Sequence, residues 1–181
     1  MTEQTFDAAF ERVRKLVADF GTHEKVYLAS EYKEDSVRKD FIDKFLIALG
    51  WDVYHEHQTN LYKQDVIAEK NVDVKGRIKK ADYAFLASNF RDVRFFVNAK
   101  KPSRNIDNAD DCFQTIRYGW NANTTVSILT DFEQFRVLDC RYKPDVVTAY
   151  DTSNQIILHE SLHDPWVTTT DENRTSICQF A

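Results

Sequence analysis

Two short apolar segments separated by a polar turn limit the folds that are open to this chain of 181 residues. The segments Asp82–Ala87 and Val93–Ala99 are rich in aromatic and β-branched side chains, which is typical of β-strands. Residues 88–92 between them are mostly polar and predict a turn. Pro102 ends the second segment, because proline cannot donate to the hydrogen-bond ladder of a central strand. The sequence therefore predicts a sheet that contains these two strands.

Helical periodicity surrounds this pair of strands. Apolar residues recur every three or four positions in three segments, which are residues 3–20, 33–49 and 109–121. Further extended segments are predicted at residues 51–54, 126–129 and 135–140. Residues 58–78 are polar and are expected to be irregular, with a turn at Gly76. This order predicts an α/β fold in which helices flank one mixed central sheet.

The composition fits a single domain with its own core. Hydrophobic residues make up 43% of the chain and aromatic residues 13%, which suffices for a buried core and argues against disorder. We expect the domain to cover residues 1–150, with 151–181 as a C-terminal extension or the start of a linker. The longest apolar run, Phe45–Leu49, is too short to cross a membrane, and the N-terminus lacks a secretory pattern. Three widely spaced cysteines favour a reducing, cytoplasmic location.

The charge of the chain is unevenly distributed. The net charge is −5, but the window from Lys75 to Arg104 holds nine basic residues and only two acidic ones. A run of this kind is most often a solvated surface. Because of the motifs that it encloses, we favour the interpretation that this window meets a polyanion.

Four groups of polar residues stand near the ends of the predicted elements. They are Lys79-Lys80-Ala81-Asp82-Tyr83, Asn98-Ala99-Lys100, Glu34 on the preceding helix, and Gln114 with Tyr118 on the following helix. Side chains alternate along a strand, so residues 98 and 100 point to the same face. Oxygen ligands from Asp82 and position 98 suit a hard cation such as Mg²⁺, with the Lys100 ammonium beside it. Glu34 can hold a further water there.

This ordered set of motifs resembles the PD-(D/E)XK nuclease superfamily between about Tyr32 and about Pro144. More narrowly, it resembles the N-terminal nuclease domain of type I restriction enzyme R subunits and of type IIG restriction–methylation enzymes. The matching elements are Tyr32-x-Glu34-x-x-x-Arg38, Ala81-Asp82-Tyr83 for "PDY", Phe95–Ser103 for "FFVEAKKPS", and the Gln114–Tyr118 helix followed by Trp120. The segments 127–131 and 135–137 match the hairpin that ends the domain of that family.

The resemblance implies an endonuclease that hydrolyses the phosphodiester bonds of double-stranded DNA with Mg²⁺ or Mn²⁺. It assigns catalytic roles to six residues, which are Asp82, Asn98, Lys100, Glu34, Gln114 and Tyr118. Among them Asp82, Asn98 and Glu34 are the expected metal ligands, and Lys100 would orient or activate the attacking water. The residues placed to meet flanking phosphates are Lys79, Lys80, Lys101 and Arg104.

Nucleotide-dependent activities are not expected in this chain itself. Its four glycines cannot build a P-loop or a dinucleotide fingerprint. Any helicase or methyltransferase activity would therefore reside elsewhere. Methyltransferase and specificity modules, on the same chain or another, are accordingly expected as partners beside DNA, and no membrane is expected.

Two positions depart from the family pattern. Asn98 stands where the family has glutamate, and Ala81 stands where it has proline. Asn98 keeps an oxygen ligand but loses the negative charge, so we expect weak Mg²⁺ binding and reduced or absent cleavage. Three explanations are open: a naturally degenerate site, a substitution introduced on purpose, or an acid elsewhere, with Glu34 the first candidate, that has taken over the role.

Other readings compete with the nuclease hypothesis. The chain could be a nuclease-fold module that has lost cleavage and retains DNA binding or a scaffold role, or a protein-interaction domain whose basic window contacts an acidic partner. Asp82 alone could cap a turn, and Glu34 alone could compensate a helix dipole. His55 and His57 alternate on the predicted extended segment and are expected to be exposed side chains.

Overall fold

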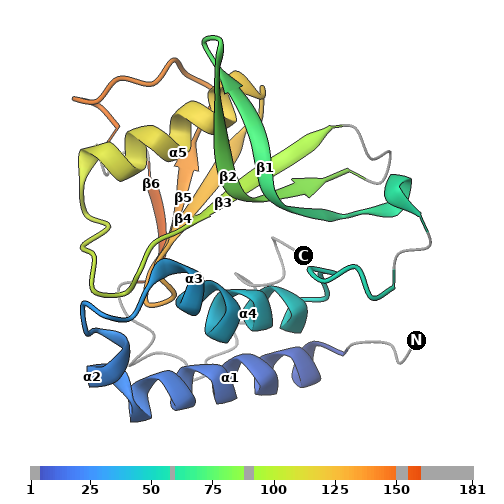
Figure 1. The fold of residues 1–181 in the computed structure, drawn as a ribbon, viewed down its shortest axis with the longest axis vertical. Coiled ribbons are helices and arrows are strands. Elements are labelled where there is room, and N and C mark those ends of the chain that lie inside the picture. Colours follow the sequence, from blue (N-terminus) through green and yellow to red (C-terminus); the bar gives the residue numbers. More distant parts are fainter. Residues whose placement is uncertain (1–4, 58–59, 88–91, 150–154, 160–181) are drawn as a thin grey trace.

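One mixed sheet of six strands forms the centre of the molecule (Figure 1). The computed structural model describes residues 5–57, 60–87, 92–149 and 155–159. The strands lie side by side in sequence order and are β1 (Val66–Val74), β2 (Arg77–Leu86), β3 (Val93–Ala99), β4 (Val126–Thr130), β5 (Phe135–Asp139) and β6 (Gln155–His159). Neighbours are antiparallel except β3 and β4, whose parallel pairing requires the crossover helix α5 (Ala109–Asn121).

The remaining helices cover the opposite face of the sheet from α5 (Figure 1). They are α1 (Phe6–Thr22), α2 (Glu24–Tyr27), α3 (Glu34–Val37), the π-helical turn η1 (Arg38–Ile42) and α4 (Asp43–Ala48). A short 3₁₀ turn, η2 (Leu61–Lys63), comes after α4 in the chain. The α3–η1–α4 segment is one continuous helix that lies against the sheet, and α1 packs outside it. None of the helices in these ranges is long and apolar enough to span a membrane.

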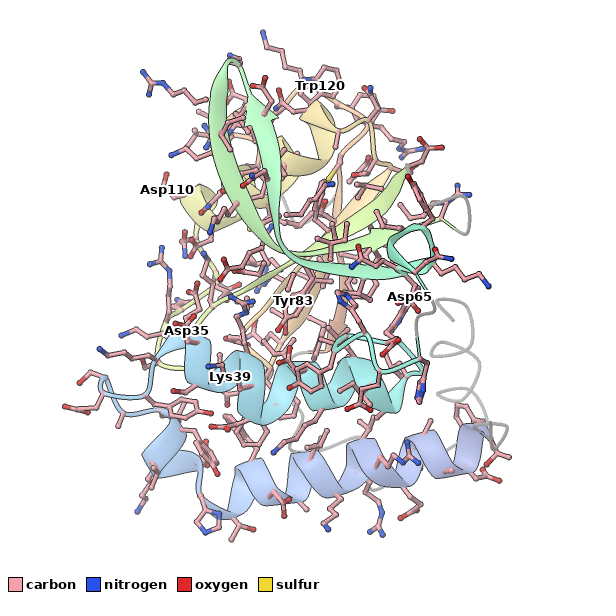
Figure 2. All side chains as sticks on the ribbon, turned by 45° about the vertical axis from the view of Figure 1, so that its right-hand side comes forward. Asp35, Lys39, Asp65, Tyr83, Asp110 and Trp120 are labelled. Atoms are coloured by element: carbon pink, nitrogen blue, oxygen red, sulfur yellow. The ribbon has the colours of Figure 1, made fainter. Side chains whose placement is uncertain are left out.

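An aromatic core joins the sheet to the helices below it. Phe20 of α1 packs edge-on against Phe41, with ring centroids 5.2 Å apart, and both rings contact Phe132. All three side chains are buried, and each contributes about 2–3 kcal/mol of hydrophobic free energy. Tyr83 of β2 lies between the sheet and the helix, as Figure 2 shows, and its hydroxyl donates to Asp43. This core fixes the α3 end of the helix against β2.

The structure confirms the predicted α/β class and most of the predicted elements. β3 and α5 have the predicted limits, and the turn at Gly76 forms with φ of +77°. The predicted helix 33–49 forms as α3–η1–α4. Residues 88–91 of the predicted turn at 88–92 lie outside the described residues.

Two local predictions are wrong. Residues 66–74 form strand β1, although residues 58–78 were expected to be irregular. The strand has few apolar residues in its middle because one face is exposed to solvent, so the alternation is weak. Residues 51–54 do not form a strand, because Trp51 packs edge-on against Phe85 of the core and residues 53–54 form a turn. His55 therefore does not lie on a strand face; its ring instead hydrogen-bonds the carbonyl of Val66.

The sheet continues past the predicted domain limit. Strand β6 pairs antiparallel with β5, although it follows the expected boundary at residue 150. The sequence analysis did not predict this strand. The division of the chain at residue 150 itself stays a prediction.

Candidate functional site

The site forms where β2 and β3 separate. Their ladder includes Tyr83 opposite Val97, and Asp82 lies one residue beyond that pair. The backbone N–H of Ala99 donates to Oδ2 of Asp82 over 2.8 Å. This bond fixes the carboxylate at the C-terminal end of β3, beside Lys100. The Lys100 charge also acts on the Asp82 carboxyl, so the two side chains lie near each other, and their catalytic roles stay predictions.

Lys100 is held between the sheet and α5. Its backbone N–H donates to the carbonyl of Thr130 in β4 over 2.8 Å. Its side chain is only 13% exposed, and Nζ lies 3.8 Å from Oδ1 of Asp111 near the start of α5. Since α5 is the crossover between β3 and β4, the topology itself brings this helix start to the end of β3.

Glu34 and Arg38 reach the same place from the helix on the other side. Nη1 of Arg38 lies 3.5 Å from Oδ1 of Asp82, and its guanidinium stacks over the Tyr83 ring at 5.1 Å. The carboxyl of Glu34 interacts electrostatically with Lys100 and Asp82, and also with Arg38. The N-terminal ends of α3 and α5 lie at the same edge of the molecule (Figure 1).

Burial raises the pKa of both carboxyl groups. For Asp82, the N–H of Ala99 and the charges of Arg38 and Lys100 act against this rise and favour the ionised form. For Glu34, the Lys100 ammonium is the strongest opposing influence on the pKa. The Glu34 and Asp82 carboxyls thus share the neighbouring charges of Arg38 and Lys100, and Lys100 also faces Asp111.

Asn98 is buried on the α5 side of the sheet. Its neighbours Val97 and Ala99 belong to the core that faces α4. Phe96 packs with Tyr118 of α5, so strand alternation turns Asn98 toward α5. The side chain is 4% exposed, and its Nδ2 has no hydrogen-bond partner among the described residues.

The oxygen atoms near Asp82 are of the type that Mg²⁺ prefers, but the negative charge expected at position 98 is missing. The Asp82 carboxylate, the Asn98 amide oxygen and the Ala99 carbonyl are all hard oxygen ligands. Within the described residues, no three His, Cys, Asp or Glu side chains gather where they could share a metal ion. A glutamate at position 98 would add a third acidic side chain to Asp82 and Glu34.

Gln114 and Tyr118 form a pair on α5. The Gln114 Nε2 donates to the Tyr118 hydroxyl over 2.7 Å. Tyr118 is buried against Val72, Val74 and neighbouring residues of the β1–β2 hairpin. The pair therefore anchors the hairpin to α5, and a role in lining a cleft stays a prediction.

The four predicted phosphate contacts differ in their surroundings. Lys79 is exposed and Lys101 is partly buried. Lys80 pairs with Glu69 at 2.9 Å. Arg104 makes a two-pronged ion pair with Asp111, at 2.6 and 2.9 Å. Lys80 and Arg104 are thus already engaged by carboxylates of their own chain.

Sequence reasoning missed Asp111, which is 3% exposed and joins Lys100 to Arg104. A signal for it was available. Asn108 caps α5 by accepting from the Asp111 N–H, and its own amide donates to the Asp111 carboxylate. Asparagine is among the preferred N-cap residues, so Asn108 marks the helix start three residues before Asp111. Sequence reasoning also assigned no role to Arg38, although it stands one helical turn after Glu34.

Comparison with known proteins supports a relationship to restriction enzymes. No protein-family model matches the chain, and no solved structure matches it. Over 133 residues the chain is 29% identical to a type II restriction enzyme and methyltransferase, RM.Eco57I of Escherichia coli. The match covers 72% of this chain and 13% of that protein's length. This similarity agrees with the resemblance to restriction enzymes that the sequence motifs suggest. The assignment to the PD-(D/E)XK superfamily stays a prediction. The chain is a relative of a restriction–modification enzyme.

Proposed function

We propose that this chain is the DNA-cleaving domain of a restriction system, built on the PD-(D/E)XK plan and dependent on Mg²⁺ or Mn²⁺. The observation that carries the proposal is the convergence of Asp82, Glu34 and Lys100 at the end of β3. The similarity to a restriction enzyme and methyltransferase supports the same class of substrate.

The residues of the site divide the work of phosphodiester hydrolysis among them. Asp82, Asn98 and Glu34, with the Ala99 carbonyl, would hold the metal, which when bound neutralises the charge that develops on the phosphate. Lys100 donates to the attacking water and orients it. Asp111 keeps the Lys100 side chain in place and acts as a positioning residue. Gln114 and Tyr118 complete the wall behind the site.

A second candidate function follows from Asn98. An amide stands where the family has a carboxylate, and no three His, Cys, Asp or Glu side chains of the described residues gather to share a metal ion. These observations favour a nuclease-fold module that binds DNA, or serves as a scaffold, without cutting it. The chain covers 13% of its relative's length, so we propose that methyltransferase and specificity modules act with it, on the same chain or another.

A plasmid-cleavage assay separates these functions. Supercoiled DNA is incubated with Mg²⁺ or Mn²⁺ and either the chain as it stands, Asn98→Glu, or Asn98→Glu combined with Lys100→Ala. Cleavage that appears with Asn98→Glu and disappears when Lys100 is removed supports the nuclease. DNA binding without cleavage in any variant supports the second function. Absence of DNA binding at low salt refutes the nuclease and the DNA-binding module, and leaves a scaffold or a protein-interaction domain.

A further inference from the structure

The β1–β2 hairpin extends beyond the rest of the sheet as a two-stranded ribbon. β2 pairs with β3 only over Tyr83–Leu86, whereas its pairing with β1 continues to Arg77. The tip of the ribbon stands at the end of the molecule opposite α1, in both views (Figures 1 and 2). Residues 75–80 are all exposed.

The ribbon is held rigidly. Its two-residue loop, Lys75-Gly76, has φ of +52° and +77°, the pattern of a type I′ turn, whose twist matches that of the flanking strands. The Gly76 N–H donates to Oδ1 of Asp73 over 2.7 Å. Val72 and Val74 are buried against Tyr118 and fasten one face of the ribbon to α5. Little conformational entropy is therefore lost when a ligand binds here.

Three cations of the ribbon are unpaired. Among the described residues, no carboxylate forms an ion pair with Lys75, Arg77 or Lys79, whereas Lys80 nearby is bound by Glu69. Arg77 and Lys79 are two positions apart on one strand, so they point to the same face with a spacing of about 7 Å. A rigid, exposed row of unpaired cations is a surface for a polyanion.

We propose that this ribbon grips the phosphate backbone of double-stranded DNA next to the bond held at the site. Lys79 is three residues from Asp82, which is about 10 Å along the strand, so its contacts fall within a few nucleotides of that bond. A two-stranded ribbon also has the width that a DNA groove admits. The inference rests on the proposed DNA-directed function. In it Lys75 and Arg77 are the main phosphate contacts, in place of the predicted contacts Lys80 and Arg104.

The test compares two triple variants that remove the same charges at opposite ends of the molecule. The ribbon variant is Lys75→Asn, Arg77→Gln and Lys79→Gln, with asparagine at 75 because it tolerates positive φ. The control variant is Arg12→Gln, Lys15→Gln and Lys25→Gln, whose exposed side chains lie on α1 and α2. A third variant, Lys75→Arg with Lys79→Arg, keeps the charge. Thermal unfolding verifies that all three fold.

Binding of a short duplex is measured by fluorescence anisotropy over a series of salt concentrations, without cleavage as a readout. Each phosphate contact contributes about 0.9 to the slope of log K against log salt, so the ribbon variant should lower the slope by about 2.7. The control and charge-preserving variants should keep it. If the unchanged chain binds and the ribbon variant binds with the same slope, the inference fails and the proposed function stands. If the unchanged chain does not bind the duplex even at low salt, both are wrong.

Discussion

Replacing Asn98 by glutamate should make the stability of the chain depend on Mg²⁺. Position 98 is 4% exposed, and a carboxylate there would stand across the strands from Asp82, itself only 21% exposed. Side chains on adjacent strands at such positions are about 5 Å apart. At an effective dielectric constant of about 20, two like charges at that distance repel by about 3 kcal/mol.

The metal-free variant is therefore expected to lose about 3 kcal/mol of unfolding free energy near neutral pH, or roughly 6–12 °C in Tm for a domain of this size. A ligand at about 100 times its dissociation constant returns about 2.7 kcal/mol. Mg²⁺ should thus restore most of the loss in Asn98→Glu and have little effect on the unchanged chain. The measurement is thermal unfolding followed by circular dichroism, with and without MgCl₂.

Asn98→Gln is the matched control, because it has the size of glutamate without its charge. It should show no response to Mg²⁺. The reasoning is refuted if Asn98→Glu unfolds at the same temperature with and without the metal, or if Asn98→Gln is stabilised equally. Either result would mean that the carboxyl at position 98 does not face the Asp82 group.

Three further substitutions test other parts of the structure. Asp111→Asn removes the negative charge that pairs with both Arg104 and Lys100. The unfolding free energy should fall by about 1–3 kcal/mol, measured as a lower urea midpoint. An unchanged midpoint would contradict these ion pairs. Gly119→Ala places a methyl group within 2.7 Å of the Ser127 hydroxyl and against Cys140. The unfolding free energy should fall by about 1–3 kcal/mol, measured by differential scanning calorimetry. An unchanged stability would mean that α5 packs less closely against β4 and Cys140. Burial raises the pKa of Asp131 from 3.8 to about 7, so the folded state loses stability as pH rises through this interval. At pH values above about 7 the loss of unfolding free energy amounts to as much as about 4 kcal/mol. Asp131→Asn should remove this loss. Urea unfolding at about pH 5 and about pH 8 checks this, and parallel pH profiles of the two proteins would contradict it.

The elements whose signals are local follow from the residues alone. β3 ends where predicted because Pro102 follows shortly after it, and α5 begins where predicted because Asn108 can cap it. These signals act over a few residues, so they do not depend on what the rest of the chain does. The order of the motif residues along the chain also sufficed to expect Asp82 and Lys100 near each other, and in the folded chain the Lys100 charge acts on the Asp82 carboxyl.

Features that depend on distant partners could not be predicted before the packing of the chain was known. β1 is held by its ladder with β2 and by the burial of Val72 and Val74 against α5, and its own residues carry little strand signal. Charged partners reach the site from both sides of the sheet, with Arg38 beside Asp82 and Asp111 beside Lys100, and no local pattern encodes that meeting. Which surface lysines are left unpaired likewise follows from packing, because an ion pair such as Lys80 with Glu69 joins residues on neighbouring strands. Contacts between residues far apart in sequence are set by how the sheet and helices pack, and that packing is a property of the whole fold.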